Sequence, residues 1–119
     1  PMMDKIKAYA KKMNPGIPET KRLVRTVQAW GAVLLLADAM KIAHKQGKLT
    51  GEGIMKAMET FKNKDLGVGS LPVTFTATDH RPATGAPIYR VEKGKFVLVD
   101  MVDLKKRWPD KWEKAWLGW

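Results

Sequence analysis

Apolar residues recur at helical spacing in the first part of the chain. Over residues 2–13 they stand three and four positions apart, which predicts an amphipathic helix with its lysines on the solvent side. An Asn-Pro-Gly turn at residues 14–16 ends this helix. A second helix is predicted over about residues 20–46, and no charged side chain interrupts it between Arg25 and Asp38. Because this helix is apolar on nearly all sides, we expect it to be buried on nearly all sides.

A third, shorter helix is predicted over about residues 50–62. Thr50 is a suitable N-cap residue, and Glu52 lies near the positive end of the helix dipole. Beyond this helix the pattern becomes extended. Residues 72–76 alternate apolar and β-branched side chains, which predicts a strand.

The last part of the chain predicts a β-hairpin and a helical tail. Strands are predicted over about residues 87–92 and 95–100, separated by the turn-forming pair Lys93-Gly94. Residues 101–119 predict a Trp- and Lys-rich tail whose helix starts at Pro109. Three tryptophans of this tail fall along one helical side: Trp112, Trp116 and Trp119. The fold class predicted from these elements is α/β.

Composition limits the function classes. A chain of 119 residues with 45% hydrophobic side chains forms at most one small domain. Its longest apolar stretch, residues 29–37, is shorter than a bilayer requires, so no membrane span is expected. The formal charge of +10 favours anionic partners, and the absence of cysteine excludes disulfides and thiolate chemistry. Because the chain starts at Pro1 without a leader, we expect a processed, proteolysed or truncated product.

No pattern of catalytic or metal-binding residues is evident in the sequence. His44 and His80 lack partners at the spacing of a nucleophile or an acid–base pair. An Asp beside His80, at position 79, is more typical of a turn than of a metal site. Residues 67–70 resemble a phosphate-binding loop only in their glycines, because the following Lys-Ser/Thr is missing. We therefore expect no enzyme activity, no metal and no cofactor.

Four segments occur in an order that resembles a known family. They are QAW with LLLADAM (residues 28–30 and 34–40), KLTGE with AME (48–52 and 57–59), GSLPVTFTATDH (69–80) and IYRVEKGKF (88–96). Together they resemble the C-terminal part of a type I periplasmic solute-binding protein, an extracellular ligand-binding receptor of the branched-chain amino acid ABC transporter family. The resemblance covers residues 1–100, whereas residues 101–119 fit no pattern of that family.

The resemblance implies the C-terminal portion of a two-lobed α/β fold whose lobes close on a small ligand. The implied function is that of the substrate-binding component of an ABC importer, which captures an amino acid or a carboxylate and delivers it to a membrane permease. The implied location is the periplasm, or the outside of a Gram-positive cell on a membrane anchor. No nucleic-acid partner is implied.

The resemblance also points to four ligand-binding residues, where the chain re-enters the first lobe: Arg25, Thr26, Val27 and Gln28. Arg25 could pair with a ligand carboxylate in bidentate geometry. Thr26 and Gln28 could supply neutral hydrogen bonds beside the positive helix N-terminus. The alternative is that Arg25 is a surface charge and Gln28 caps a turn. Thr26 stands where an aromatic residue is commoner in the family and Ala29 replaces a glycine, so the ligand chemistry is expected to differ.

Two other functions remain open at this stage. The cations at residues 105–107 next to Trp108 are typical of a small basic nucleic-acid-binding domain, in which indoles stack on bases. The tryptophan stripe equally fits packing on the protein's own core. A structural domain with permanent subunit contacts is the third hypothesis. Because the apolar helix needs neighbours on several sides, we expect a homo-oligomer that buries residues 34–36 and the tail tryptophans.

Overall fold

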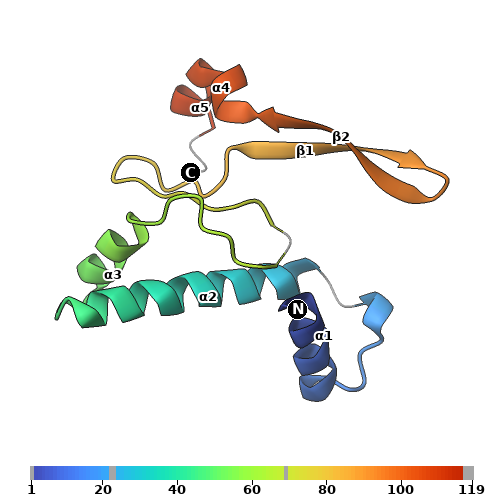
Figure 1. The fold of residues 1–119 in the computed structure, drawn as a ribbon, viewed down its shortest axis with the longest axis horizontal. Coiled ribbons are helices and arrows are strands. Elements are labelled where there is room, and N and C mark those ends of the chain that lie inside the picture. The colour runs from blue at the N-terminus through green and yellow to red at the C-terminus, as the bar shows by residue number, and fades with distance from the viewer. Residues whose placement is uncertain (1, 22–23, 69, 117–119) are drawn as a thin grey trace. The chain divides into compact units, whose positions relative to one another are not determined.

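The structure, a computed structural model, describes residues 2–21, 24–68 and 70–116. It is mixed α/β and divides into two compact units, Pro1–Pro82 and Ala83–Trp119. The first unit holds helices α1 (Met2–Met13), α2 (Val24–Lys45) and α3 (Gly51–Met58) with a short 3-10 helix, η1 (Glu19–Lys21). The second holds strands β1 (Gly85–Glu92) and β2 (Lys95–Asp103) and helices α4 (Leu104–Arg107) and α5 (Pro109–Lys114) (Figure 1). The boundary expected after residue 100 falls within β2.

Helix α2 is the long element of the first unit, and α1 and α3 pack toward its opposite ends (Figure 1). It starts later than the expected residue 20, since η1 is a separate turn and residues 22–23 lie outside the described residues. The expectation of burial on nearly all sides is wrong: Val33 is 65% exposed and Leu36 is 47% exposed. The described neighbours of α2 leave one of its faces open.

The core of the first unit lies where α2, α3 and the following segment meet. Its buried members are Ala39, Ala43, Ala57, Phe61, Val73 and Phe75, with Leu35, Ile42, Ile54, Met58 and Leu66 packed against them. Three of these are alanines on facing helices, which allows the two helix backbones to approach closely. The predicted N-cap is confirmed, because the Thr50 hydroxyl accepts a hydrogen bond from the Gly53 N–H at 3.1 Å.

The segment after α3 is irregular, and the strand expected over residues 72–76 is not formed. Val73 makes an isolated bridge with Lys64, and the Phe75 N–H donates to the carbonyl of Phe61 at 3.1 Å. Val73 and Phe75 are buried while Thr74 between them is half-buried, so the alternation in the sequence is reflected in burial. A strand also needs a continuous partner for its backbone groups, and the described chain offers none to residues 72–76.

A polar contact fastens this segment to α2. The Lys64 ammonium donates to Asp38 Oδ2 at 2.8 Å, and Lys41 approaches the other carboxylate oxygen at 3.4 Å. The hydrogen bond from Lys64 is the main cause that lowers the pKa of Asp38 below its ordinary value. The pair therefore holds the irregular segment against the same helix that carries the core alanines.

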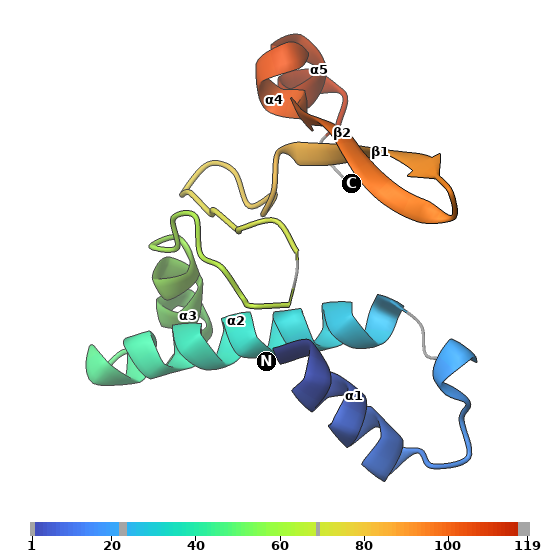
Figure 2. The same ribbon diagram turned by 45° about the vertical axis from the view of Figure 1, so that its right-hand side comes forward.

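The predicted hairpin is confirmed. Strands β1 and β2 are antiparallel, and both residues of the turn, Lys93 and Gly94, have positive φ, as a type I′ turn requires. Ile88 pairs with Asp100 but Tyr89 pairs with Leu98, which leaves Val99 as a β-bulge. The turn lies at the end of the ribbon away from α4 and α5 (Figure 2). Both strands extend beyond the expected bounds, to residues 85 and 103.

One face of this ribbon is apolar over most of its length. Given the register and the alternation of side chains along a strand, the apolar residues on it are Pro87, Tyr89, Val91, Phe96, Leu98 and Met101, and Asp103 lies beyond them opposite Gly85. The rings of Tyr89 and Phe96 meet edge to face with centroids 6.3 Å apart. Phe96 is nonetheless 79% exposed. We call this surface the apolar ribbon face.

The tail forms two short helices. Pro109 occupies the first turn of α5, as predicted, and Asp103 caps α4 by accepting from the Lys106 N–H at 3.0 Å. The tryptophans do not form the expected stripe. Trp112 is buried, whereas Trp116 follows the end of α5 and meets the ring of Trp108 edge to face. Trp119 lies outside the described residues.

The length and composition of one helix among the described residues, at Arg25–Lys45, would suffice to cross a membrane. The core helix of a soluble protein and a signal sequence meet the same criterion. The expected absence of a membrane span therefore stays a prediction.

Candidate functional site

The four ligand-binding residues expected from the sequence begin the described part of α2. Thr26 and Val27 are half-buried, whereas Arg25 and Gln28 are exposed. Successive residues of an α-helix are turned by about 100° from one another, so four in a row cannot all face one ligand. The structure therefore divides them between different surfaces.

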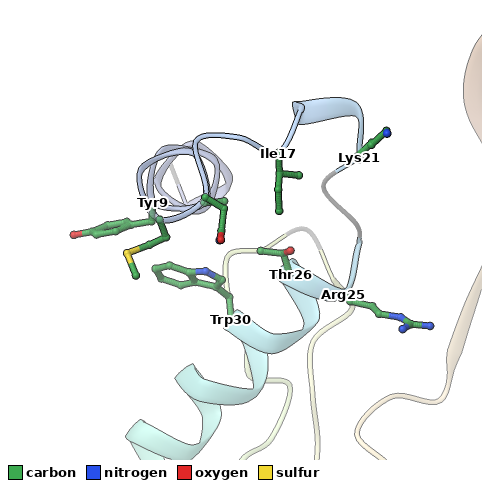
Figure 3. A pocket seen from close by; sticks show the side chains of 9 residues that line it. Tyr9, Ile17, Lys21, Arg25, Thr26 and Trp30 are labelled. Carbon is green, nitrogen blue, oxygen red and sulfur yellow. The ribbon is translucent and has the colours of Figure 1, made fainter.

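A pocket of about 450 Å³ opens between α1, the segment that follows it and the start of α2. Its lining residues are Tyr9, Ala10, Met13, Asn14, Ile17, Lys21, Arg25, Thr26 and Trp30. We call it the α1–α2 pocket. In Figure 3, Thr26 and Ile17 face each other across it, while Arg25 and Lys21 extend away from Trp30 at its edge. Its volume lies within the range usual for small-molecule sites.

A smaller pocket of about 140 Å³ lies beside the first and is lined by residues that include Thr26, Val27 and Glu19. Thr26 therefore borders both pockets. Val27 lines the smaller pocket, and Gln28 lines neither. The structure thus brings Arg25 and Thr26 together at the α1–α2 pocket and separates Gln28 from them.

An aromatic pair forms one side of the α1–α2 pocket. The rings of Tyr9 and Trp30 lie with centroids 5.8 Å apart and planes inclined by 45°. Both residues fall within helices predicted from the sequence, but no pattern there marks either one as part of a site. The sequence could have indicated this pair only in that each member is a large aromatic residue near the turn that joins the two helices. Their contact depends on how the helices pack.

The polar part of the pocket is cationic. Lys21 and Arg25 are exposed at its edge, and none of the described lining residues is acidic. The nearest carboxylate in the lining of the neighbouring pocket is that of Glu19, which pairs with the Lys7 ammonium at 3.6 Å. The arrangement therefore suits an anionic group placed near an apolar, aromatic wall.

The remaining candidate residues make local contacts where the structure describes them. Asp79 accepts from the backbone N–H of Arg81 at 3.1 Å and from its guanidinium at 2.8 Å, as expected of a turn residue. His80 lies 3.2 Å from a carboxylate oxygen of Glu59. No group of three His, Cys, Asp or Glu side chains able to hold a metal occurs in the described ranges. Gly67, in the glycine-containing loop, donates its N–H to Asp65 at 2.8 Å in a turn.

The basic tail is less suited to base stacking than its sequence indicated. The ring of Trp108 is covered by the Arg107 guanidinium at 4.9 Å from its centroid and meets the edge of Trp116 at 5.9 Å. A nucleobase would have to displace these contacts to stack there. Nucleic-acid binding stays a hypothesis with this observation against it.

Comparison with known proteins identifies the family. The family model described as periplasmic binding protein matches residues 2–95, which include α1, α2, α3, the core segment and the start of the hairpin. No curated protein and no solved structure matches the chain. Proteins of this family bind solutes, are generally non-enzymatic, and are located in the periplasm or outside the cell. The match covers most of the sequence and agrees with the mixed α/β fold, so the chain belongs to the periplasmic binding protein family.

Proposed function

We propose that the chain is part of the substrate-binding component of an ABC importer, which captures a small carboxylate or amino acid and delivers it to a membrane permease. The observation that carries the proposal is the α1–α2 pocket, where Arg25 and Thr26 of the expected site lie beside an aromatic pair. Arg25 lines the edge of this pocket, and a guanidinium there can pair with a carboxylate in bidentate geometry.

Ligand binding in the intact protein tests this proposal. We expect carboxylates or amino acids to raise the melting temperature, because a ligand that binds only the folded state stabilises it by RT ln(1 + [L]/Kd). Arg25→Ala should weaken carboxylate binding by about 1.5–3 kcal/mol, the usual contribution of a hydrogen bond to a charged group. Isothermal titration calorimetry measures this loss.

A matched control for Arg25→Ala is Lys12→Ala, which removes an exposed cation that lines neither pocket. Affinity should be unchanged in this variant. If Arg25→Ala also leaves affinity unchanged, Arg25 is a surface charge. If a broad ligand panel produces no stabilisation of the intact protein, the transport function itself is contradicted.

We also propose that the 119-residue chain self-associates. Support comes from the open face of α2, where Val33 is 65%, Leu36 47% and Met40 40% exposed. Leu35, which we expected at the contact, instead packs against the core. Contiguous apolar surface of this kind is uncommon on soluble monomers. The contact would therefore use Val33, Leu36 and Met40 in place of Leu35.

Sedimentation equilibrium at micromolar concentration checks the association. The expected result is a mass of twice the 13.4 kDa of the chain. Leu36→Lys should shift the equilibrium to monomer, because it places a charge in the apolar contact. Lys45→Gln should not, because Lys45 is exposed on the opposite side of the same helix from Leu36. A compact monomer with a cooperative thermal transition would show that the chain needs no partner.

A further inference from the structure

We infer that the α1–α2 pocket takes an aromatic carboxylate that carries no ammonium group, such as an aryl-substituted short-chain acid. The inference rests on the proposed function and narrows its ligand class, since both an amino acid and a plain carboxylate remained open there. It follows from two properties of the lining residues, their aromatic surface and their charge.

The apolar side of the pocket is open to a planar ligand. Tyr9 is 54% exposed, Met13 73% and Ile17 45%, so each has side-chain surface that a ligand can cover. The Tyr9 and Trp30 rings are too close together, at 5.8 Å, to admit a third ring between them. A ligand ring would instead pack against the pair, with Met13 and Ile17 beside it. Aromatic rings pack favourably against other rings and against thioether sulfur, which favours an aryl group over an alkyl group.

The charged side of the pocket discriminates against an ammonium group. An α-amino acid carries an ammonium beside its carboxylate, and a cation that leaves water to enter the pocket is best stabilised by an acceptor with negative charge. Asn14 and Thr26 offer neutral hydrogen bonds only, while Lys21 and Arg25 would repel it. Glu19 borders the smaller pocket, but its carboxylate already pairs with Lys7 at 3.6 Å. The described lining residues can therefore pair with a carboxylate on the ligand. They offer no free negative charge to pair with an ammonium group on the same ligand.

The orientation of the ligand follows from these two sides. The carboxylate lies at the edge, which Arg25 and Lys21 line; both side chains extend outward there and turn toward the carboxylate when the ligand binds, so that the guanidinium offers its planar fork of donors and the ammonium adds charge. The Thr26 side chain lies opposite Ile17 across the pocket (Figure 3), and its hydroxyl can donate to the same carboxylate. The aryl ring then points toward Trp30.

Methyl NMR of the 119-residue chain tests the inference. Met13 lines the pocket, so its labelled methyl group reports binding there directly. Four probes are titrated in turn: phenylacetate, L-phenylalanine, phenethylamine and cyclohexylacetate. We expect a saturable shift of the Met13 signal with phenylacetate and none with phenethylamine. L-phenylalanine should bind at least about tenfold more weakly because of its ammonium, and cyclohexylacetate several-fold more weakly because it lacks the π face.

Three substitutions test the charged part and the aromatic part of the pocket separately. Arg25→Gln should weaken phenylacetate binding about tenfold or more through loss of the charge-assisted pair. Trp30→Leu should remove the preference for phenylacetate over cyclohexylacetate, and Trp30→Phe should largely retain it, which guards against a folding defect in the leucine variant. Lys12→Gln removes a cation that lines neither pocket and should have no effect.

The possible outcomes show whether the inferred ligand class or the proposed function is at fault. If L-phenylalanine or L-leucine binds as tightly as phenylacetate, the pocket accepts an ammonium and the inference is wrong, while solute binding stands. If none of the probes and no amino acid shifts the Met13 signal, both the inference and the proposed site are overturned. Tighter binding of phenethylamine than of phenylacetate would overturn the charge argument alone.

Discussion

Phe61→Ala is expected to lower the free energy of unfolding of the first unit by about 3–5 kcal/mol. The Phe61 ring is only 6% exposed and belongs to the cluster formed by α2, α3 and the segment after α3. Its removal would leave a cavity and would also remove the contact of the Lys64 ammonium with the ring, at 4.9 Å from the centroid. Chemical denaturation followed by circular dichroism at 222 nm measures the loss.

Phe96→Ala is the matched control for Phe61→Ala, because it makes the same substitution where the ring is 79% exposed. We expect a change below about 1 kcal/mol there, which is the contribution of a cross-strand aromatic pair. If the two variants lose equal stability, the cluster around Phe61 is not the core of the first unit.

Gly53→Ala is expected to destabilise the same unit by about 1–3 kcal/mol, as overpacking does. Gly53 is buried in the first turn of α3, and a Cβ atom added there would overlap the carbonyl oxygen of Lys48. That oxygen belongs to the backbone and accepts the Thr50 N–H at 2.8 Å, so it cannot move aside without disturbing the helix cap. A lower melting temperature in a thermal scan is the expected result.

Gly51→Ala, two residues earlier in the chain, is expected not to destabilise the unit. A Cβ atom at Gly51 meets nothing within 4 Å, so alanine should be neutral or stabilise by about 0.4–1 kcal/mol through a smaller entropy of the unfolded chain. Together the two variants separate crowding from helix propensity, since both replace glycine by alanine in the same turn. Equal effects of both substitutions would contradict the close approach of Lys48 to Gly53.

Local signals in the sequence predicted local structure well. Thr50 caps α3, Pro109 starts α5 and the pair Lys93-Gly94 makes the hairpin turn, because each effect depends on the backbone within a few residues. The family resemblance was likewise carried by short segments, and it is confirmed over residues 2–95.

Features that depend on distant residues were not predictable in this way. The alternation over residues 72–76 reports that Val73 and Phe75 are buried, but it does not reveal whether a neighbouring strand is present. The exposed face of α2 depends equally on what packs against it. The Tyr9–Trp30 pair joins two helices, so neither helix pattern alone indicated that the aromatic rings would meet at a pocket. For the same reason, helical rotation divided the expected site residues: Arg25 and Thr26 line the α1–α2 pocket, Val27 lines the smaller pocket, and Gln28 lines neither.

The two-stranded ribbon has a consequence for aggregation. Each strand has only one neighbour among the described residues, so each presents an edge of backbone groups that a strand of another molecule can join. The apolar ribbon face would stabilise such a stack. The bulge at Val99 interrupts the ladder, and the cations at Lys93 and Lys95 repel the same end of a second ribbon. The hairpin therefore carries both an edge that favours misassembly and features that oppose it.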